Sequence, residues 1–212
     1  LDQWREAVQI AAAACESGEW VIKLILSRGI DQGPAPTAWV TASPAPDFAH
    51  VRTAGVRIAV LDRGIDSGAA ERAPWLLLGA KTLSYAVNMA AIREAKRRGA
   101  DDAVFVSTDG ILLEAPTASV LLRFGDTFVT PAPGAGILHG TTQVSTFEWL
   151  AAEGFATEYR TVAASDLARA DAAWLLSSVR LAAPVTAFDG AAVPVDAELT
   201  SRMNAYLLSP RD

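Results

Sequence analysis

A single lysine stands in an otherwise uncharged and largely apolar stretch of the sequence. Residues 73–89 read APWLLLGAKTLSYAVNM, and Lys81 is their only charged side chain. An ammonium group is costly to hold away from water, so two interpretations stay open. Either the aliphatic stem of Lys81 lies on apolar surface while its charge reaches water, or the amine is kept in this setting for chemistry.

A glutamate closes a second apolar stretch. Glu114 ends the run ILLE at residues 111–114 and is followed by APTASV. Because carboxylates are almost never fully buried unless they are paired, either this end of a predicted strand is exposed or a cation faces Glu114. Glu114 is therefore a second candidate site residue.

Two hydroxyl-bearing stretches could bind an anion. In ILHGTTQ, residues 137–143, Gly140 with Thr141 and Thr142 begins a predicted helix, where free backbone N–H groups and the helix dipole favour negative charge. An ordinary helix cap would have the same sequence. Ser178 ends the apolar run LLSS, and such a run can equally end in a plain turn. None of these stretches is decisive by itself.

The other reactive residue types are sparse. Cys15 is the only cysteine, which excludes an internal disulfide and a thiolate metal cage. The two histidines, His50 and His139, fall in different predicted domains. This distribution argues against a metal enzyme or a Ser-His-Asp enzyme, and we expect no metal site.

The candidate residues need elements to position them, and the chain alternates helix-like and strand-like segments. Helix signals mark residues 4–17, 80–98, 140–154, 165–170 and 196–208. Strand-like runs occupy residues 21–28, 37–44, 56–62, 103–107, 111–115, 119–124, 127–131, 155–162, 173–178 and 183–190. Tight turns between several of these runs cannot make parallel crossovers, so mainly antiparallel or mixed sheets are expected.

This alternation predicts two domains of α/β (α+β) class. Residues 1–65 are expected to form the remainder of a small N-terminal α+β domain, and residues 75–212 a larger α/β domain. The polar, small residues 66–74 between them are predicted to be the linker. A helix that starts at residue 4, with Leu1 as the first residue, leads us to expect that the chain begins inside a longer protein.

The overall charge of the chain limits the classes of partner that it is expected to bind. The net charge is −6, and no basic cluster interrupts the sequence, so neither a nucleic acid nor a membrane surface is expected as a partner. The apolar runs are too short or too interrupted to span a bilayer. A cytoplasmic protein with a small-molecule ligand is the expectation.

The order of these motifs resembles that of a known family. A lysine opening a helix, a strand-turn-strand unit ending in glutamate, then TP…ILHGTTQ and LLSS…APV…DG, is similar to the order in fold-type IV enzymes that use pyridoxal 5′-phosphate, the class IV aminotransferases. This family includes branched-chain aminotransferases, D-amino acid transaminases and 4-amino-4-deoxychorismate lyase. The resemblance covers residues 21–190, and AKTLSYAVNMAAIREA with SRG at residues 27–29 looks most like the lyase branch.

The resemblance implies a catalytic pair. Lys81 would bond covalently to the cofactor aldehyde, which requires a deprotonated amine, and apolar surroundings favour that form. Glu114 would face the pyridine nitrogen and keep the ring protonated, so that electrons released at the substrate Cα can flow into it.

The resemblance also implies cofactor contacts. Gly140, Thr141 and Thr142 would form the phosphate-binding loop, and Ser178 would add a second hydroxyl at the phosphate. Tyr85 lies near a family tyrosine that faces the phenolic oxygen of the cofactor, with an offset from the lysine that is one residue shorter.

One further position is a candidate substrate contact, and two others differ from the family pattern. Arg28, in SRG, is where the family places substrate-facing groups and could pair with a carboxylate. Two positions depart from the family pattern: Ser119 stands where asparagine is usual, and Gln143 where lysine or arginine is usual. The phosphate-binding arginine of the family is expected upstream of Leu1.

The implied function is that of a 4-amino-4-deoxychorismate lyase, which releases pyruvate and 4-aminobenzoate, a folate precursor. A class IV aminotransferase of branched-chain or D-amino acid type is the alternative, because the same groups serve both reactions. A non-catalytic homologue that keeps the fold is the third. An amino substrate and a homodimer with sites near the subunit interface are further implications of the resemblance.

Overall fold

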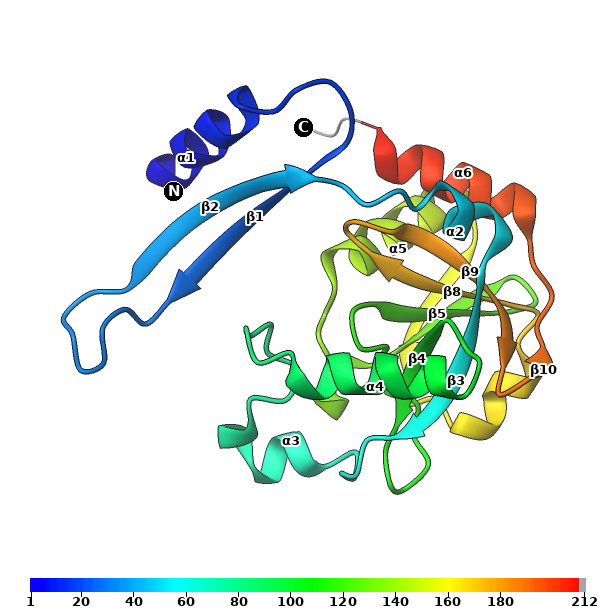
Figure 1. Cartoon of the computed structure of the whole chain (residues 1–212). Coiled ribbons are helices and arrows are strands. Elements are labelled where there is room, and N and C mark those ends of the chain that lie inside the picture. Colours follow the sequence, from blue (N-terminus) through cyan, green and yellow to red (C-terminus); the bar gives the residue numbers. More distant parts are fainter. Residues whose placement is uncertain (210–212) are drawn as a thin grey trace. The chain divides into compact units, whose positions relative to one another are not determined.

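A computed structural model describes residues 1–209, and the chain forms two compact units, Leu1–Asp47 and Phe48–Asp212. The first unit contains α1 (Asp2–Ala13), β1 (Trp20–Ser27) and β2 (Thr37–Pro44). β1 and β2 pair as an antiparallel hairpin in continuous register, and α1 packs against both strands, as the blue segments of Figure 1 show. The predicted α+β character of this region is therefore present in a small unit.

The second unit contains the remaining elements. Its helices are α2 (Ala49–Ala54), α3 (Ala69–Arg72), α4 (Ala86–Arg97), α5 (Thr141–Ala152) and α6 (Ala197–Leu208), with the short 3₁₀ helices η1 (Pro74–Leu76), η2 (Pro133–Ala135) and η3 (Ala164–Arg169). Its strands are β3 (Val56–Asp62), β4 (Asp102–Val106), β5 (Ser119–Phe124), β6 (Thr127–Pro131), β7 (Ala156–Arg160), β8 (Ala172–Ser177), β9 (Leu181–Phe188) and β10 (Ala191–Ala192). Within the described residues, none of the helices combines the length and apolar character that crossing a membrane requires.

The strands of the second unit form an eight-stranded mixed sheet. The order is β4-β3-β9-β8-β5-β6-β7, and β10 pairs with β9. β3 runs parallel to β4 and β9, and β6 runs parallel to β7. The pairs β5–β6 and β8–β9, which are joined by short turns, are antiparallel, and so is the pair β5–β8, whose strands are far apart in the sequence. The predicted mixed sheet and the α/β (α+β) class are confirmed.

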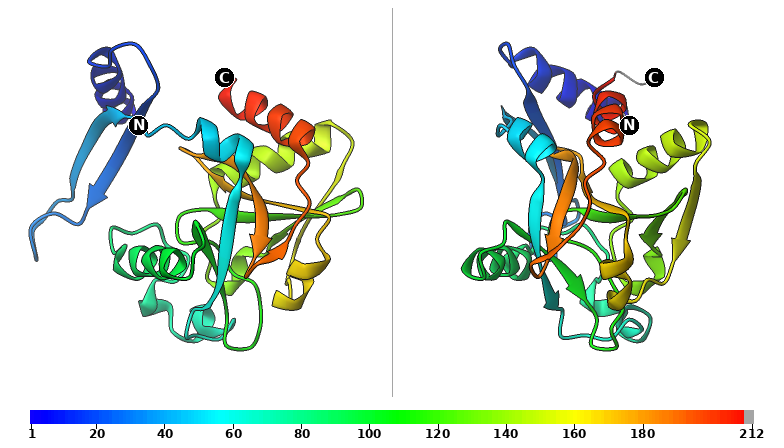
Figure 2. Two further views of the ribbon diagram at one scale, coloured as in Figure 1. Left: turned by 45° about the vertical axis from the view of Figure 1, so that its right-hand side comes forward. Right: turned by 90° about the vertical axis from the view of Figure 1, so that its right-hand side faces the viewer.

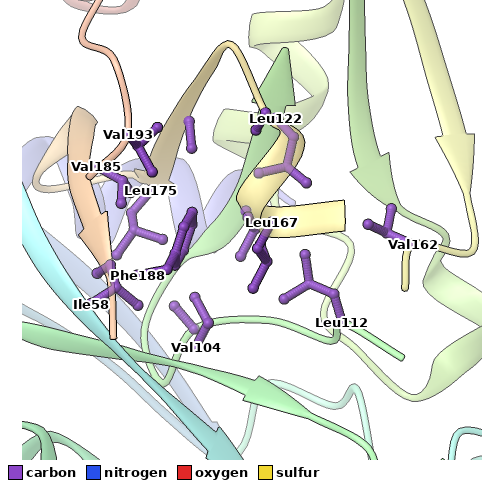
Figure 3. Packing of buried hydrophobic residues seen from close by; sticks show 14 of the residues in the cluster. Ile58, Val104, Leu112, Leu122, Val162, Leu167, Leu175, Val185, Phe188 and Val193 are labelled. Carbon is purple, nitrogen blue, oxygen red and sulfur yellow. The ribbon is translucent and has the colours of Figure 1, made fainter. Parts of the chain in front are cut away.

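The sheet is apolar on both faces because successive side chains of a strand point in opposite directions. In β5, Val120 and Leu122 belong to one buried cluster, whereas Leu121 belongs to another. Figure 3 shows the first cluster, in which strand side chains meet Leu167 of η3. Packing within this first cluster fixes the positions of the strands of the large sheet.

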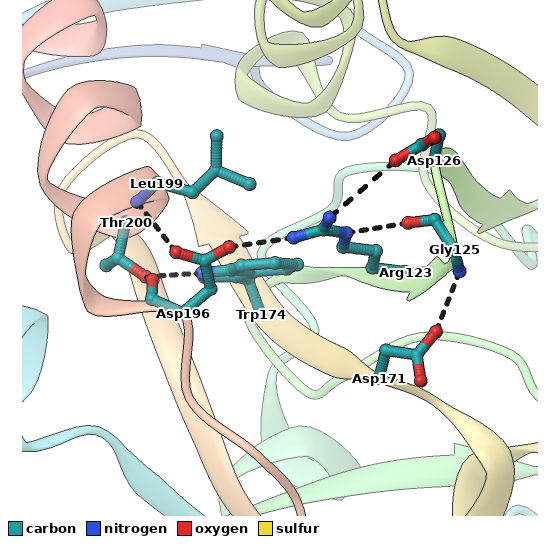
Figure 4. Close-up of polar contacts among 8 residues, drawn as sticks. All are labelled: Arg123, Gly125, Asp126, Asp171, Trp174, Asp196, Leu199 and Thr200. Carbon is teal, nitrogen blue, oxygen red and sulfur yellow. Dashed lines mark hydrogen bonds and ion pairs between the residues drawn. The ribbon is translucent and has the colours of Figure 1, made fainter.

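Helices α5 and α6 cover the other side of β5, β6 and β8, and Figure 2 shows the two helices next to each other. The indole N–H of Trp174 donates to the Thr200 hydroxyl at 2.8 Å. Arg123 of β5 pairs with Asp196 at 2.7 Å, and the same carboxylate accepts the Leu199 N–H as the N-cap of α6 (Figure 4). These contacts fix the start of α6 against the sheet.

The boundary between the compact units lies earlier than the predicted boundaries at residues 65 and 75. β3 was assigned to the small domain, but it pairs with β4 and β9 in the large sheet. The predicted linker, residues 66–74, also belongs to the second unit, where Ser67 donates to Asp109 at 2.7 Å and Asp66 pairs with Arg72. An apolar run such as VRIAVLD predicts a strand but not its partner, which is why the sequence misplaced it.

Residues 111–115, predicted as a strand, form only isolated bridges, from Ile111 to Ala163, from Leu112 to Val106 and from Ala115 to Ala118. Their backbone groups are divided between two neighbours: Leu113 donates to Phe105 of β4, and Leu112 donates to Val162. A continuous ladder with either neighbour is therefore not formed. This irregular segment carries Glu114.

Candidate active site

A cavity of about 650 Å³ in the second unit collects most of the predicted site residues. It is lined by residues from the segments 76–88, 113–119, 136–142 and 176–178, together with side chains at the ends of β3 and β4. Seven of the eight predicted positions lie in this lining, namely Lys81, Tyr85, Glu114, Gly140, Thr141, Thr142 and Ser178. Residues up to about 100 positions apart in the sequence thus meet at one cavity.

Lys81 is not at the start of a helix, as the sequence predicted, but on an irregular segment that precedes α4. The Thr82 hydroxyl accepts the Ser84 N–H at 3.2 Å, and such a local side-chain bond competes with helical pairing, so α4 begins only at Ala86. The Lys81 side chain is exposed rather than enclosed in apolar surroundings, and its Nζ donates to the Tyr85 hydroxyl at 2.9 Å. Tyr85 therefore orients the amine at the cavity wall.

Two glycines allow the Lys81 segment to lie against the loop before α5. Gly79 has φ +78°, and a Cβ there would come within 2.8 Å of the Ile137 carbonyl oxygen. Gly136 has φ +73°, and its Cβ would come within 2.9 Å of the Leu78 Cβ. Positive φ and this close approach both require glycine. The two loops are thereby held against each other on one side of the cavity.

Glu114 is half-buried in the same cavity, and its Oε2 accepts the Leu138 N–H at 3.0 Å. Burial raises the pKa of Glu114, while the Leu138 hydrogen bond, the Arg63 charge and the Lys81 charge each lower it. The sequence left open whether Glu114 is exposed or has a cation near it; the structure leaves it half-buried, with the charge of Arg63 and then that of Lys81 favouring its ionised form. Arg63, which directly follows β3, was not among the predicted site residues.

The N-terminus of α5 forms the hydroxyl-rich end of the cavity. Gly140 is the N-cap and no side chain caps the helix, so the first N–H groups of α5 are available to an anion. The Thr142 and Ser178 hydroxyls lie 3.3 Å apart and bring α5 and the end of β8 together. A Cβ at Gly140 would lie 2.6 Å from the Ser119 Oγ, so the absence of a side chain there leaves room for the Ser119 hydroxyl.

The turn that carries Ser178 is fixed by contacts that the sequence did not reveal. Arg52 of α2 donates from Nε to the Arg180 carbonyl and from Nη2 to the Val179 carbonyl, each at 3.1 Å. The Arg180 guanidinium pairs in turn with Asp102 of β4 at 2.8 Å, with the two side chains 12% and 5% exposed. Arginine and aspartate so far apart in sequence give no local signal of such a pair.

Gln143 and Arg28, two further positions singled out in the sequence, do not line the cavity. Gln143, where the family has a basic residue, is 2% exposed, and its Oε1 accepts the Tyr159 hydroxyl at 3.1 Å. Tyr159 also bonds to His139 at 3.2 Å, so Gln143 supports the cavity wall from inside. Arg28 follows β1 in the first compact unit, where its side chain is exposed, and its role remains a prediction.

The residues present fit pyridoxal 5′-phosphate by their chemistry. The cavity offers an amine for the aldehyde, a carboxylate for the ring nitrogen, and an uncapped helix start with two hydroxyls for the phosphate. Among the described residues, no group of three or more His, Cys, Asp or Glu side chains is arranged to hold a metal ion.

Comparison with known proteins gives matches over most of the chain. The family model described as amino-transferase class IV matches residues 1–188. A curated relative, the bifunctional aminodeoxychorismate lyase / D-amino acid transaminase of Mycobacterium tuberculosis (strain ATCC 25618 / H37Rv), is 43% identical over 205 residues, which are 92% of this chain and 71% of the relative.

Solved structures agree with these matches. The fold IV-transaminase CpuTA1 from Curtobacterium pusillum is 49% identical, with a TM-score of 0.91 over 97% of this chain and 70% of that one. The PLP-bound form of a hypothetical aminotransferase from Mycobacterium tuberculosis is 42% identical, with a TM-score of 0.92 over 99% of this chain and 77% of that one.

Proposed function

Because the chain belongs to the class IV aminotransferase family and its cofactor is pyridoxal 5′-phosphate, we propose that it is a lyase releasing pyruvate and 4-aminobenzoate from 4-amino-4-deoxychorismate. The observation that carries this proposal is the convergence of Lys81, Glu114 and the uncapped start of α5 on one cavity. An amine, a carboxylate and an anion site are the three groups that this cofactor needs.

Lys81 and Glu114 have distinct roles in this proposal. When bound, the cofactor supplies a conjugated ring that accepts electrons from the substrate Cα. Lys81 would hold the cofactor through its Nζ, and its free amine would serve as the general base that takes the proton from the substrate Cα. Tyr85 orients this amine through the 2.9 Å hydrogen bond. The Glu114 carboxylate would face the ring nitrogen and would stabilise the proton there.

The phosphate group has a separate set of proposed contacts. The backbone N–H groups at the start of α5, with the Thr141 and Thr142 hydroxyls, bind the phosphate, and Ser178 adds a hydroxyl from the end of β8. The 3.3 Å contact between Thr142 and Ser178 supports their action on one group. Arg28 is proposed to pair with a substrate carboxylate.

Transamination is the second candidate activity of the same site. A curated relative with 43% identity is described as a bifunctional lyase and D-amino acid transaminase, and a structure with 49% identity is described as a transaminase. The two reactions would share Lys81 as the base at Cα and differ in the next step. The lyase reaction would break the bond to the group that leaves as pyruvate, whereas transamination would deliver a proton to the cofactor. A substrate that can lose pyruvate favours the lyase outcome.

Two parallel assays test the proposal. One tube contains 4-amino-4-deoxychorismate and is followed by release of pyruvate and 4-aminobenzoate, and the other contains a D- or branched-chain amino acid with 2-oxoglutarate. We expect turnover in the first tube. Turnover confined to the second tube would replace the lyase by an aminotransferase, and no turnover with no bound cofactor would identify a non-catalytic homologue.

A homodimer is also proposed, with its interface near the cavity. Large apolar side chains are exposed on η1, on the segment leading into α4 and in the first turn of α4: Trp75 is 74% exposed, Leu83 68% and Val87 57%. Leu77 and Val87 also line the cavity, so the apolar patch borders the site. Contiguous exposed apolar surface of this kind is typical of a protein interface.

A further inference from the structure

Arg63 is a half-buried cation of the cavity lining to which the proposed function gives no role. It directly follows β3, and its backbone N–H donates to the Val106 carbonyl at 2.8 Å. Its Cζ lies 4.2 Å from the centroid of the Phe105 ring on the adjacent β4. The aromatic face and the parallel strand pair thus hold the guanidinium at a fixed place in the cavity wall.

One nitrogen of the Arg63 guanidinium lacks a hydrogen bond to the described residues. Its Nη1 is buried and has no hydrogen-bond partner within the described part of the chain. Arginine remains charged in proteins, and burial of an unpaired charge is costly unless an opposite charge is close. The only carboxylate in the cavity lining is that of Glu114, whose Oε2 is already held by Leu138.

The other titratable side chains that line the cavity are Lys81 from the segment before α4, Tyr85 at the start of α4, and His139 before α5. Lys81 is the only one of these besides Arg63 that acts on Glu114 as a charge. The proposed function makes Lys81 Nζ bond to the cofactor and move a proton, so the charge of Lys81 changes during turnover. Arg63 is therefore the cation of the cavity lining whose charge stays constant while Lys81 reacts.

We propose that Arg63 is a positioning residue for the reaction, which keeps Glu114 ionised and oriented toward the ring nitrogen of the cofactor. This inference rests on the proposed function for its catalytic consequence, but the coupling of the two side chains is a property of the protein without cofactor. Burial raises the pKa of Glu114 and the Arg63 charge opposes that rise. A neutral residue at position 63 therefore leaves Glu114 protonated up to a higher pH.

The experiment compares two neutral variants, Arg63→Met and Arg63→Gln, with the charge-conserving Arg63→Lys. Arg160→Met is the matched control, because Arg160 also lies over a phenylalanine ring, that of Phe124 at 5.3 Å, but does not line the cavity. The titration of Glu114 is followed by carbon NMR of cofactor-free protein labelled at glutamate carboxyl groups. The Glu114→Gln variant assigns the signal. Circular dichroism confirms that each variant is folded.

The expected result is a Glu114 midpoint at higher pH in both neutral variants, close to the parent value in Arg63→Lys, and unchanged in Arg160→Met. Binding of pyridoxal 5′-phosphate at neutral pH should weaken by about tenfold in the neutral variants. This is the change in affinity that corresponds to a rise of about one in the pKa of Glu114. A folded neutral variant with the parent Glu114 titration would overturn the proposal. Failure of the parent to bind the cofactor would instead overturn the proposed function, while the titration would still decide the role of Arg63.

Discussion

At the scale of single residues, the site combines an accessible amine with a shielded carboxylate. Lys81 is exposed and is positioned by Tyr85, whereas Glu114 is half-buried and has Arg63 as its facing charge. The sequence predicted the identity of both groups, because a lone lysine and a lone glutamate in apolar stretches are unusual. It could not predict their environments, because exposure and facing charges are set by segments elsewhere in the chain.

The raised pKa of Glu114 predicts that this residue lowers the stability of the cofactor-free protein at neutral pH, although the proposed reaction needs it. Between the ordinary carboxyl value of 4.5 and the raised value, the folded state binds more protons than the unfolded state. The free energy of unfolding therefore falls as pH rises through this window. Glu114→Gln should remove this fall, so that the cofactor-free variant is at least as stable as the parent at neutral pH.

Activity should move in the opposite direction. Loss of a preorganised charge at the reacting ring should lower turnover on the order of 100-fold. Urea unfolding at pH 4 and pH 7, with parallel assays, checks both effects, and Glu148→Gln on the exposed side of α5 is the control. A Glu114→Gln variant that is less stable at neutral pH and fully active would be inconsistent with the assigned role.

At the scale of elements, the site depends on where helices and strands end. α4 starts after Lys81 because the turn at Thr82 competes with it, and α5 starts at the uncapped Gly140. The turn after β8 ends with Leu181 at φ +64°, a strained value for a leucine, which persists because Arg52 and the Arg180–Asp102 pair hold the turn. Side-chain periodicity predicts that an element exists but not these terminal contacts.

Removal of the partner of Arg180 tests the turn. Asp102→Ala leaves a buried guanidinium unpaired, which should lower the free energy of unfolding by about 3 kcal/mol. It should also weaken cofactor binding, because Ser178 lies on the released turn. Denaturant unfolding and cofactor titration measure the two effects.

The matched control for this prediction is Glu153→Ala, which breaks the exposed pair with Arg202 and should change stability by less than about 1 kcal/mol. Equal effects of Asp102→Ala and Glu153→Ala would show that the Arg180–Asp102 pair does not hold the turn.

A second element-scale prediction concerns the packing of the two loops at the cavity. Gly136→Ala places a Cβ within 2.9 Å of both Ala70 and Leu78 at a positive φ. The variant should be destabilised by about 1 to 3 kcal/mol, and it should lose cofactor affinity because the Lys81 segment shifts. Gly125→Ala is the control: its φ of +58° is also positive, but nothing lies within 4 Å of the added Cβ. Similar losses of cofactor affinity in both variants would contradict the proposed loop contact.

At the scale of the whole molecule, the order of motifs along the chain predicted the family and the residues that meet at the cavity. This succeeded because the spacing of Lys81, Glu114, Gly140 and Ser178 reflects the succession of elements that end at one cavity. The boundary between the two units lies earlier than predicted, because β3 pairs with β4 and β9, and such long-range pairing leaves no mark in a local apolar run. The supporting residues Arg52, Arg63 and Asp102 were missed for the same reason.

The proposed homodimer is tested by charges placed on the exposed apolar patch. Trp75→Glu and Leu83→Glu should convert a dimer of the parent protein to monomers, since a buried unpaired carboxylate opposes association. Sedimentation equilibrium measures the change. Leu208→Glu on α6 is the control, because this leucine is also exposed, at 55%, and lies outside the patch. A parent that sediments as a monomer would remove the dimer proposal.

The covalent attachment of the cofactor tests the account most directly. The chain has three lysines, Lys23, Lys81 and Lys96, so reduction of the protein–cofactor link with borohydride, followed by peptide mass spectrometry, identifies the bonded amine among few candidates. The account predicts the cofactor mass on the peptide that contains Lys81, with its loss in Lys81→Ala and its retention in Lys96→Ala. A reduced cofactor on Lys23 or Lys96, or none at all on protein that is folded and saturated with pyridoxal 5′-phosphate, would contradict it.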